Sequence, residues 1–259
     1  MSRTSLRAVP SHREPESDLA ARYGAVRSRS LALVAPLSPE DCTAQSMPDA
    51  SPLKWHLAHT SWYFETFVLQ PYVKGYKVFD PAYRTLFNSY YNAVGDKYPR
   101  PQRGAITRPG LDEVRAYRVH VDVAMRGCLA ELPPAPEVVD RIELGLHHEQ
   151  QHQELILTDL KHLLSLNPQK PAYKPTWPPA HVESRQFGWI PFVGGTRDMG
   201  HEGRGFAFDN EGPRHPVLVP PFILASHPVT CGEYLAFIED DGYRRPEFWL
   251  SLGFDRVQA

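Results

Sequence analysis

Apolar residues recur with a helical period in four stretches of the chain. The first runs from about residue 14 to residue 34, where Leu19, Tyr23, Val26 and Leu33 lie three, four or seven positions apart. Three further stretches show the same periodicity, at about residues 52–70, 111–132 and 136–166. Because this spacing places apolar side chains on one face, it predicts four amphipathic helices.

The residues at the ends of these stretches support the prediction. Ser51 precedes Pro52 at the start of the second stretch, where a serine can cap the helix and a proline fits its first turn. Residues 71–110 are rich in Tyr, Asn, Gly, Pro and Arg and show little periodicity. A loop of roughly 40 residues inside a compact domain is more often functional than idle. Four helices with one long connection predict a four-helix bundle.

The composition changes after Asn167. Residues 168–179 contain five prolines, and ten of the chain's 17 glycines fall within residues 185–259. Short apolar runs there, such as Pro216–Val219 and Phe222–Leu224, alternate with turns and predict short strands. The expected fold is therefore mainly α, with a helical bundle followed by a loop-rich α+β segment. Its expected boundaries are a loose tail (1–13), the bundle (14–167), a proline-rich linker (168–184) and the second segment (185–259).

Charge and composition narrow the class of protein. The 28 basic and 30 acidic side chains give a formal net charge of −2, which offers no electrostatic reason to expect a nucleic acid or an anionic membrane as partner. No apolar run approaches the ~20 residues that span a bilayer, and the first thirty residues lack the apolar core of a secretory signal. Three widely spaced cysteines fit a reducing compartment. We therefore expect a cytoplasmic protein, in an oligomeric state that the sequence does not indicate.

Two groups of histidines are the candidate chemistry. His148 and His152 lie four apart in the last long helix, so both project from one face and can share a metal ion. The spacing alone is a weak signal, because 12 histidines supply roughly half such a pair by chance and a solvated polar face is the alternative.

His56 and His59 lie among aromatic residues of the second helix, where a satisfied core histidine is the commoner outcome. His59 is the more central of the two. Two helices of one bundle that each offer inward histidines are nevertheless how metal sites are built in bundle cores. Three imidazoles on one side of a metal would leave positions open for catalysis, and spacing does not choose between zinc and iron(II).

Three motifs in a fixed order carry a resemblance to a known family. They are SPLKWHLAHTSWYFE (51–65), LFNSYYNAVGDKYPRPQRG (86–104) and HHEQQHQELILTDLKH (147–162), and they closely resemble the ergothioneine-biosynthesis sulfoxide synthases, the EgtB family. Those proteins join a DinB-like four-helix bundle to a domain of the formylglycine-generating-enzyme (sulfatase-modifying factor) type. Residues 192–222 and 228–243 look like the opening of that second domain.

The resemblance implies a mononuclear nonhaem iron(II) centre with His59, His148 and His152 as ligands. The implied reaction uses dioxygen to form a C–S bond between hercynine (N-alpha-trimethylhistidine) and cysteine or gamma-glutamylcysteine, and oxidises the sulfur to a sulfoxide. Related enzymes act on unmethylated histidine for ovothiol or use selenium donors, and the sequence does not separate these.

The resemblance also implies roles for residues beyond the iron ligands. Arg100 and Arg103 match arginines that hold the carboxylate of the sulfur donor, a task that suits a planar guanidinium. Gln151 matches a glutamine near the hercynine site, and Tyr90 or Tyr91 matches a loop tyrosine that donates a proton. From the residues alone, these are loop arginines, a polar helix residue and two packing tyrosines.

Two other interpretations remain open. A DinB-like thiol transferase or hydrolase would use zinc and a bound water, although this leaves the motifs after residue 185 unexplained. Members of the resembled family continue for well over a hundred residues beyond the point that matches Ala259, so we also expect a C-terminally truncated chain. The third interpretation is accordingly a truncated, non-catalytic product in which the bundle survives.

Overall fold

The computed structural model of the protein describes residues 19–130, 135–174, 176, 187–203 and 205–259. The chain divides into two compact units, Met1–Pro178 and Pro179–Ala259. The expected N-terminal tail (1–13) and most of the expected linker (168–184) lie outside the described residues.

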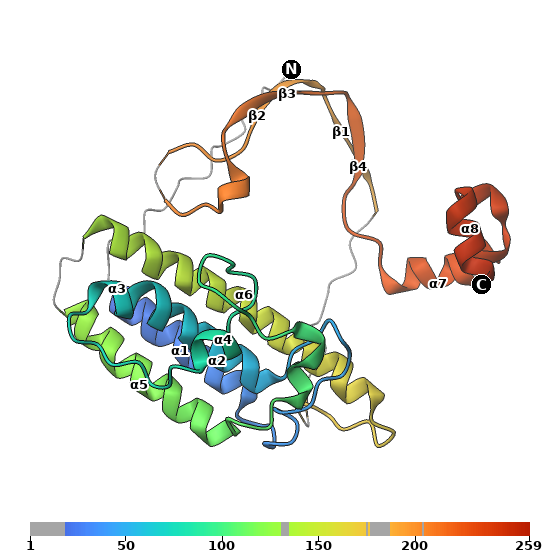
Figure 1. Ribbon diagram of the computed structural model, residues 1–259. Coiled ribbons are helices and arrows are strands. Elements are labelled where there is room, and N and C mark those ends of the chain that lie inside the picture. Colours follow the sequence, from blue (N-terminus) through green and yellow to red (C-terminus); the bar gives the residue numbers. More distant parts are fainter. Residues whose placement is uncertain (1–18, 131–134, 175, 177–186, 204) are drawn as a thin grey trace. The chain divides into compact units, whose positions relative to one another are not determined.

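The first unit is a bundle of four long helices (Figure 1). They are α1 (Leu19–Val34), α2 (Leu53–Phe64), α5 (Leu111–Ala130) and α6 (Pro136–Leu166). Helix α2 packs against both α5 and α6, and α1 packs against α6. The predicted mainly α fold with a four-helix bundle is confirmed, and the described helices begin and end within a few residues of the periodic stretches.

Helix α2 is the central element of the bundle. All twelve of its residues are buried, including Trp55, Trp62 and Phe64, which is typical of a helix enclosed on every side. The predicted helix 52–70 changes geometry at Glu65, where a π-helical turn, η1 (Glu65–Leu69), leads into the short α3 (Gln70–Tyr72).

The carboxylate of Glu65 is buried but fully satisfied. It accepts hydrogen bonds from the hydroxyls of Tyr76 and Tyr117, both at 2.7 Å, and from the backbone N–H of Phe79 at 3.1 Å. These bonds join the π-helical turn to α5 and to the start of the long connection.

The connection that the sequence left irregular contains two short helices, α4 (Tyr83–Leu86) and the 3₁₀ helix η2 (Arg100–Ala105). Two tryptophans on one face of α2 are hydrogen-bonded to this connection. The indole N–H groups of Trp55 and Trp62 donate to the carbonyls of Leu86 and Arg84, at 3.2 and 3.1 Å. The connection therefore runs along α2, on the same face as His59.

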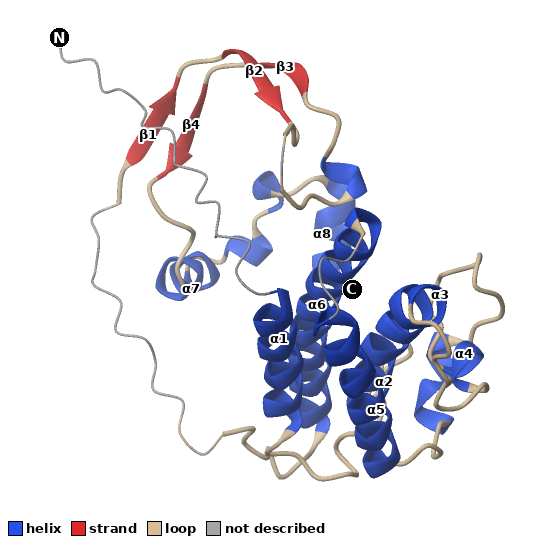
Figure 2. Ribbon diagram, turned by 90° about the vertical axis from the view of Figure 1, so that its left-hand side faces the viewer, coloured by secondary structure: helices blue, strands red, loops and turns tan. Residues whose placement is uncertain are grey.

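The second unit contains two antiparallel two-stranded ribbons, shown as strands in Figure 2. Strand β1 (Trp189–Phe192) pairs with β4 (Phe222–Ala225), and β2 (Gly195–Met199) pairs with β3 (His215–Val219). Helices α7 (Cys231–Glu239) and α8 (Ser251–Gln258) follow, with the short 3₁₀ turns η3 (Asp209–Glu211), η4 (Gly242–Arg244) and η5 (Pro246–Phe248). The expected loop-rich α+β character is confirmed.

Apolar side chains of the second unit are largely exposed. Among the residues described in this unit, Gly242 alone is buried, while Val193, Leu250 and Leu252 are each more than 80% exposed. Two-stranded ribbons are marginal unless a helix or further strands cover one face. The packed core of the described chain therefore lies in the bundle.

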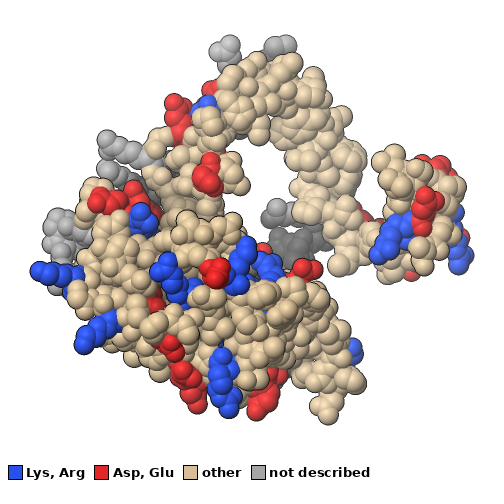
Figure 3. Space-filling model, in the orientation of Figure 1, with Lys and Arg blue, Asp and Glu red and all other residues tan. Residues whose placement is uncertain are grey.

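On the face of the bundle that Figure 3 shows, basic and acidic side chains are interspersed rather than gathered by sign. No helix among the described residues is long and apolar enough to cross a membrane.

Candidate metal centre

Three buried histidines of the bundle meet at one point. His59 comes from α2, and His148 and His152 come from successive turns of α6. Each offers a ring nitrogen, and these nitrogens all lie within 4.8 Å of one another. The centroids of the His148 and His152 rings are 4.6 Å apart, as expected of neighbours one turn apart on a helix. The packing of α2 on α6 brings His59 to the same place.

Three of the six ring nitrogens in this cluster are buried without a hydrogen-bond partner. Nδ1 of His59 lies 2.6 Å from the carbonyl oxygen of Phe87, to which it donates, and Nε2 of His59 is buried without a hydrogen-bond partner. Both ring nitrogens of His148 are also buried and unpartnered. Buried polar atoms are nearly always satisfied, so orphaned nitrogens that converge indicate a missing ligand.

Burial keeps these imidazoles neutral. It lowers the pKa of His59 and of His152 well below the usual histidine value, and the neighbouring histidines lower both further. Burial also lowers the pKa of His148 to about 4. A neutral imidazole has a lone pair to give to a metal, so the residues fit a divalent transition metal bound by three nitrogens, with further positions open.

His152 has a partner that the other two histidines lack. Its Nδ1 lies 2.8 Å from Nδ1 of His56, and Nε2 of His56 lies 3.0 Å from Oδ2 of Asp159. The same Oδ2 accepts the backbone N–H of Ser51 at 2.9 Å. His56 thus lies beside the three clustered histidines, although it was not among the predicted ligands.

Behind the cluster lies a buried group of charges that sequence reasoning missed. Glu149 is fully buried and contacts Arg27 and Arg118, each at 2.9 Å, and the Ser30 hydroxyl at 2.6 Å. Although burial alone would raise it, the two guanidinium groups hold the pKa of Glu149 at about 2. Arg27 and Ser30 are buried on the inward face of α1. In the sequence they appear only as polar residues between the apolar positions of that helix.

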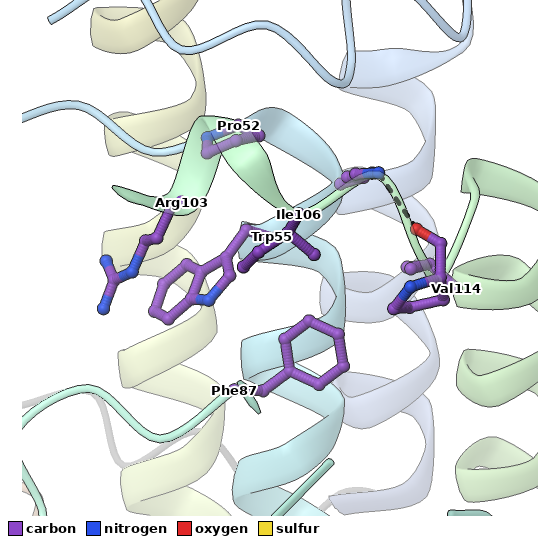
Figure 4. A pocket seen from close by; sticks show the side chains of 8 residues that line it. Pro52, Trp55, Phe87, Arg103, Ile106 and Val114 are labelled. Atoms are coloured by element: carbon purple, nitrogen blue, oxygen red, sulfur yellow. Dashed lines mark hydrogen bonds between the residues drawn. The ribbon is translucent and has the colours of Figure 1, made fainter. Parts of the chain in front are cut away.

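Arg103, predicted to hold a substrate carboxylate, lies beside Trp55 (Figure 4). Its guanidinium carbon is 3.4 Å from the centre of the Trp55 ring, and its Nη atoms contact the hydroxyls of Ser51 and Ser89 at 2.8 and 3.3 Å. The other face-to-face neighbour of Trp55 is His59, whose ring stacks at 4.5 Å. The pocket drawn in Figure 4 leaves no room for a water molecule.

The remaining predicted residues are less buried than Arg103. Arg100 and Gln151 are exposed. Tyr91 is half-buried, its ring 5.4 Å from that of Trp62, and Tyr90 is exposed and stacks on Tyr91 at 4.9 Å. Burial, and then Tyr90, raise the pKa of the Tyr91 phenol. The structure thus brings Arg103 close to the cluster. The ring of Trp62 lies between Tyr91 and His59. Arg100 and Gln151 lie on the surface.

Comparison with known proteins gives two family matches. Residues 22–156 match the DinB superfamily, and residues 176–257 match the sulfatase-modifying factor enzyme 1-like domain. These matches follow the same order as the two units of the chain.

Curated relatives share both parts. The chain is 33% identical over 252 residues to the hercynine oxygenase of Mycolicibacterium thermoresistibile, an alignment that covers 95% of this chain and 53% of the relative. It is 30% and 28% identical over 247 residues to the hercynine oxygenases of Mycobacterium tuberculosis and Mycolicibacterium smegmatis, covering 93% of this chain and 55% and 54% of those proteins. The chain thus spans about half the length of the curated relatives that it matches.

Proposed function

The chain belongs to the DinB superfamily, and on that premise we propose that it is the iron-binding part of a sulfoxide synthase of the hercynine oxygenase type. The activity would use dioxygen to join hercynine to cysteine or gamma-glutamylcysteine through a C–S bond. Domain boundaries at 14–167 for the bundle and 185–259 for the second segment form part of the proposal. The observation that carries it is the cluster of three neutral, buried imidazoles, two of which have unpartnered ring nitrogens, within the residues that match the DinB superfamily.

His59, His148 and His152 would hold the metal. The chemistry that iron(II) supplies when bound is the binding and activation of dioxygen. The protein's part is to keep the three imidazoles neutral by burial and to leave coordination positions on the other side open. A ligand set without a carboxylate or thiolate adds no negative charge, so a thiolate substrate can approach without repulsion.

Arg103 would bind the carboxylate of the sulfur donor. Its guanidinium packs against Trp55 and is hydrogen-bonded to Ser51, which pre-orients it for paired hydrogen bonds with a carboxylate. Arg100, which lies one turn earlier in the 3₁₀ helix η2 and is exposed, would attract the same carboxylate. Gln151 would contact hercynine from the surface of α6. Tyr91 would be the proton donor rather than the exposed Tyr90, because its ring packs against Trp62, which in turn stacks on His59.

The test is anaerobic reconstitution of the chain with iron(II), followed by measurement of oxygen uptake. Oxygen consumption that requires both hercynine and a thiol supports the proposal, and comparison of cysteine with gamma-glutamylcysteine identifies the donor. Uptake that is independent of hercynine would overturn it for this chain. His152→Ala is expected to lose iron, and stoichiometric iron in that variant would overturn the ligand assignment.

The same cluster also fits zinc, the metal of the alternative DinB-like hydrolase or transferase. Competition between the two metals separates these functions. Preferential binding of zinc together with zinc-dependent thiol transfer or hydrolysis would favour the alternative.

A further inference from the structure

We infer that His56 and Asp159 are positioning residues, which fix the tautomer and the ring orientation of His152 so that its Nε2 faces the other two histidines. The inference rests on the proposed three-histidine site and goes beyond it, because neither residue touches the metal. It assigns a task to two buried polar residues of α2 and α6 that packing alone does not explain.

The geometry forms a continuous chain of three polar groups. Oδ2 of Asp159 is 3.0 Å from Nε2 of His56, and Nδ1 of His56 is 2.8 Å from Nδ1 of His152. All three side chains are buried, with exposed fractions of 8% or less. In a buried setting each of these contacts is a hydrogen bond that is costly to lose.

The direction of the two hydrogen bonds follows from the chemistry of the groups. A carboxylate only accepts, so the proton between Asp159 and His56 belongs to Nε2 of His56. A neutral imidazole carries one N–H, so Nδ1 of His56 is then an acceptor. The proton between the two histidines therefore lies on Nδ1 of His152, and Nε2 of His152 keeps its lone pair.

That tautomer is the one that a metal ligand needs. Without a partner, a neutral imidazole can carry its proton on either nitrogen, and the form with Nε2–H cannot bind a metal through Nε2. Metal-bound histidines generally donate their second ring N–H to an oriented acceptor for this reason. The carbonyl of Phe87 does the same for His59, at 2.6 Å. We call the hydrogen-bonded chain from Asp159 through His56 to His152 the relay. It fixes the tautomer of His152 through side chains, as the backbone carbonyl of Phe87 fixes the tautomer of His59.

The spacing of the residues explains how two helices build this relay. His56 and His59 lie three apart on α2, and His152 and Asp159 lie seven apart, two turns, on α6. One pair of helix faces therefore carries both the ligands and the groups that orient them. The backbone N–H of Ser51, just before α2, donates to Asp159 at 2.9 Å and holds the far end of the relay.

The test compares cobalt(II) binding, followed by its visible absorption bands, among variants of the whole chain. His56→Leu is expected to weaken cobalt(II) affinity about 10–100-fold and to shift the bands. His56→Asn places an amide oxygen near the position of Nδ1 and is expected to recover most of that affinity. Leu57→Ala, which removes core packing at the next position of α2 but no polar group from the hydrogen-bonded chain, should bind cobalt(II) like the parent protein once folded.

Two results would overturn the inference: His56→Leu binding within about twofold of the parent, or His56→Asn losing as much affinity as His56→Leu. His59→Ala separates this from failure of the proposed function. If His59→Ala retains full affinity, the three-histidine site is wrong; if it loses affinity while His56→Leu does not, only the relay is wrong.

A measurement on the unmutated, metal-free protein removes any dependence on how the variants fold. Two-bond nitrogen–proton correlation NMR of histidine labelled with ¹⁵N reports which ring nitrogen carries the proton. We expect Nδ1–H for His152 and Nε2–H for His56. The opposite tautomer at His152 would overturn the inference whatever the variants do.

Discussion

Glu149 shows how one residue can hold several elements together. Its carboxylate joins α6 to α1 through Arg27 and to α5 through Arg118, and Arg27 in turn contacts Asp122 at 2.7 Å. Removing one member of a buried ion pair leaves the others charged and desolvated, which costs more than the pair itself contributes.

We therefore expect Glu149→Gln to lower the free energy of unfolding by about 3–5 kcal/mol, measured by urea denaturation. The matched control on the same helix is Glu143→Gln, whose ion pair with Arg22 is partly exposed. That change should cost no more than about 1 kcal/mol. Equal losses in the two variants would contradict a special role for the buried group.

The buried histidines predict how the stability of the metal-free bundle depends on pH. The folded-state pKa of His148 is about 4, below the unfolded value of about 6.5, so between these values the unfolded chain binds the extra proton. The stability contributed by neutral His148 is thus complete above pH 6.5 and is lost as the pH falls toward 4, by up to about 3 kcal/mol.

This dependence is checked by urea denaturation of the metal-free protein between pH 7 and pH 4. His148→Leu should flatten the decline over that range, because leucine binds no proton. A decline of the same size in the variant would assign it to other groups.

The sequence did not reveal several residues of the site, for reasons that are physical. His148 and His152 were predicted as a pair from their helical spacing, and His59 was predicted as the third ligand from the family resemblance. Arg27 and Glu149 were not, since their partners come from helices whose relative rotation a one-dimensional pattern does not contain. Glu65 was missed likewise, because its donors come from the irregular connection and from α5, which no helical period relates to it.

At the scale of the element, the packing of α6 on α2 depends on Gly145. A Cβ atom at this position would lie 2.6 Å from ring carbons of both Tyr63 and Phe64, closer than real contacts allow. The aromatic rings of α2 therefore use the space that a side chain on α6 would fill.

Gly145→Ala is expected to destabilise the bundle by about 1–3 kcal/mol, although alanine is the better helix former. Gly127 in α5 is the control, because nothing lies within 4 Å of its added Cβ. Gly127→Ala should raise stability by about 0.5–1 kcal/mol. Thermal unfolding of both variants measures the difference. A Gly145→Ala variant that is more stable than the parent would show that the rings at the α2–α6 contact move aside at little cost.

Periodicity predicted the four long helices well and other elements poorly. The π-helical turn at Glu65–Leu69 was not predicted, because its residues continue the apolar pattern of α2. Helix α7 was also missed, although the sequence contains a signal for its start, Thr230 followed by Glu233. These two residues cap the helix reciprocally. Thr230 Oγ1 accepts from the N–H of Glu233, and the Glu233 carboxylate accepts from the N–H of Thr230. Strands β1 and β2 lack the alternation of a half-buried strand, since both faces are exposed.

At the scale of the whole molecule, the two units should differ sharply in local stability. The bundle has a packed core of aromatic and aliphatic side chains, whereas the ribbons of the second unit bury almost nothing. Hydrogen exchange should therefore be slow for backbone amides of α2 and α6 and fast for those of β1–β4, by at least about a thousandfold. Strand amides protected to the same degree as α2 would contradict this picture.

The enclosure of α2 has a consequence for how this sequence can change. A helix with one solvent-exposed face, such as α5, tolerates substitution at about half of its positions, and these positions recur with the helical period. All twelve positions of α2 are in contact with other parts of the bundle, so the segment has no neutral positions on which mutations can accumulate. We therefore expect residues 53–64 to change more slowly over evolutionary time than helices that have an exposed face.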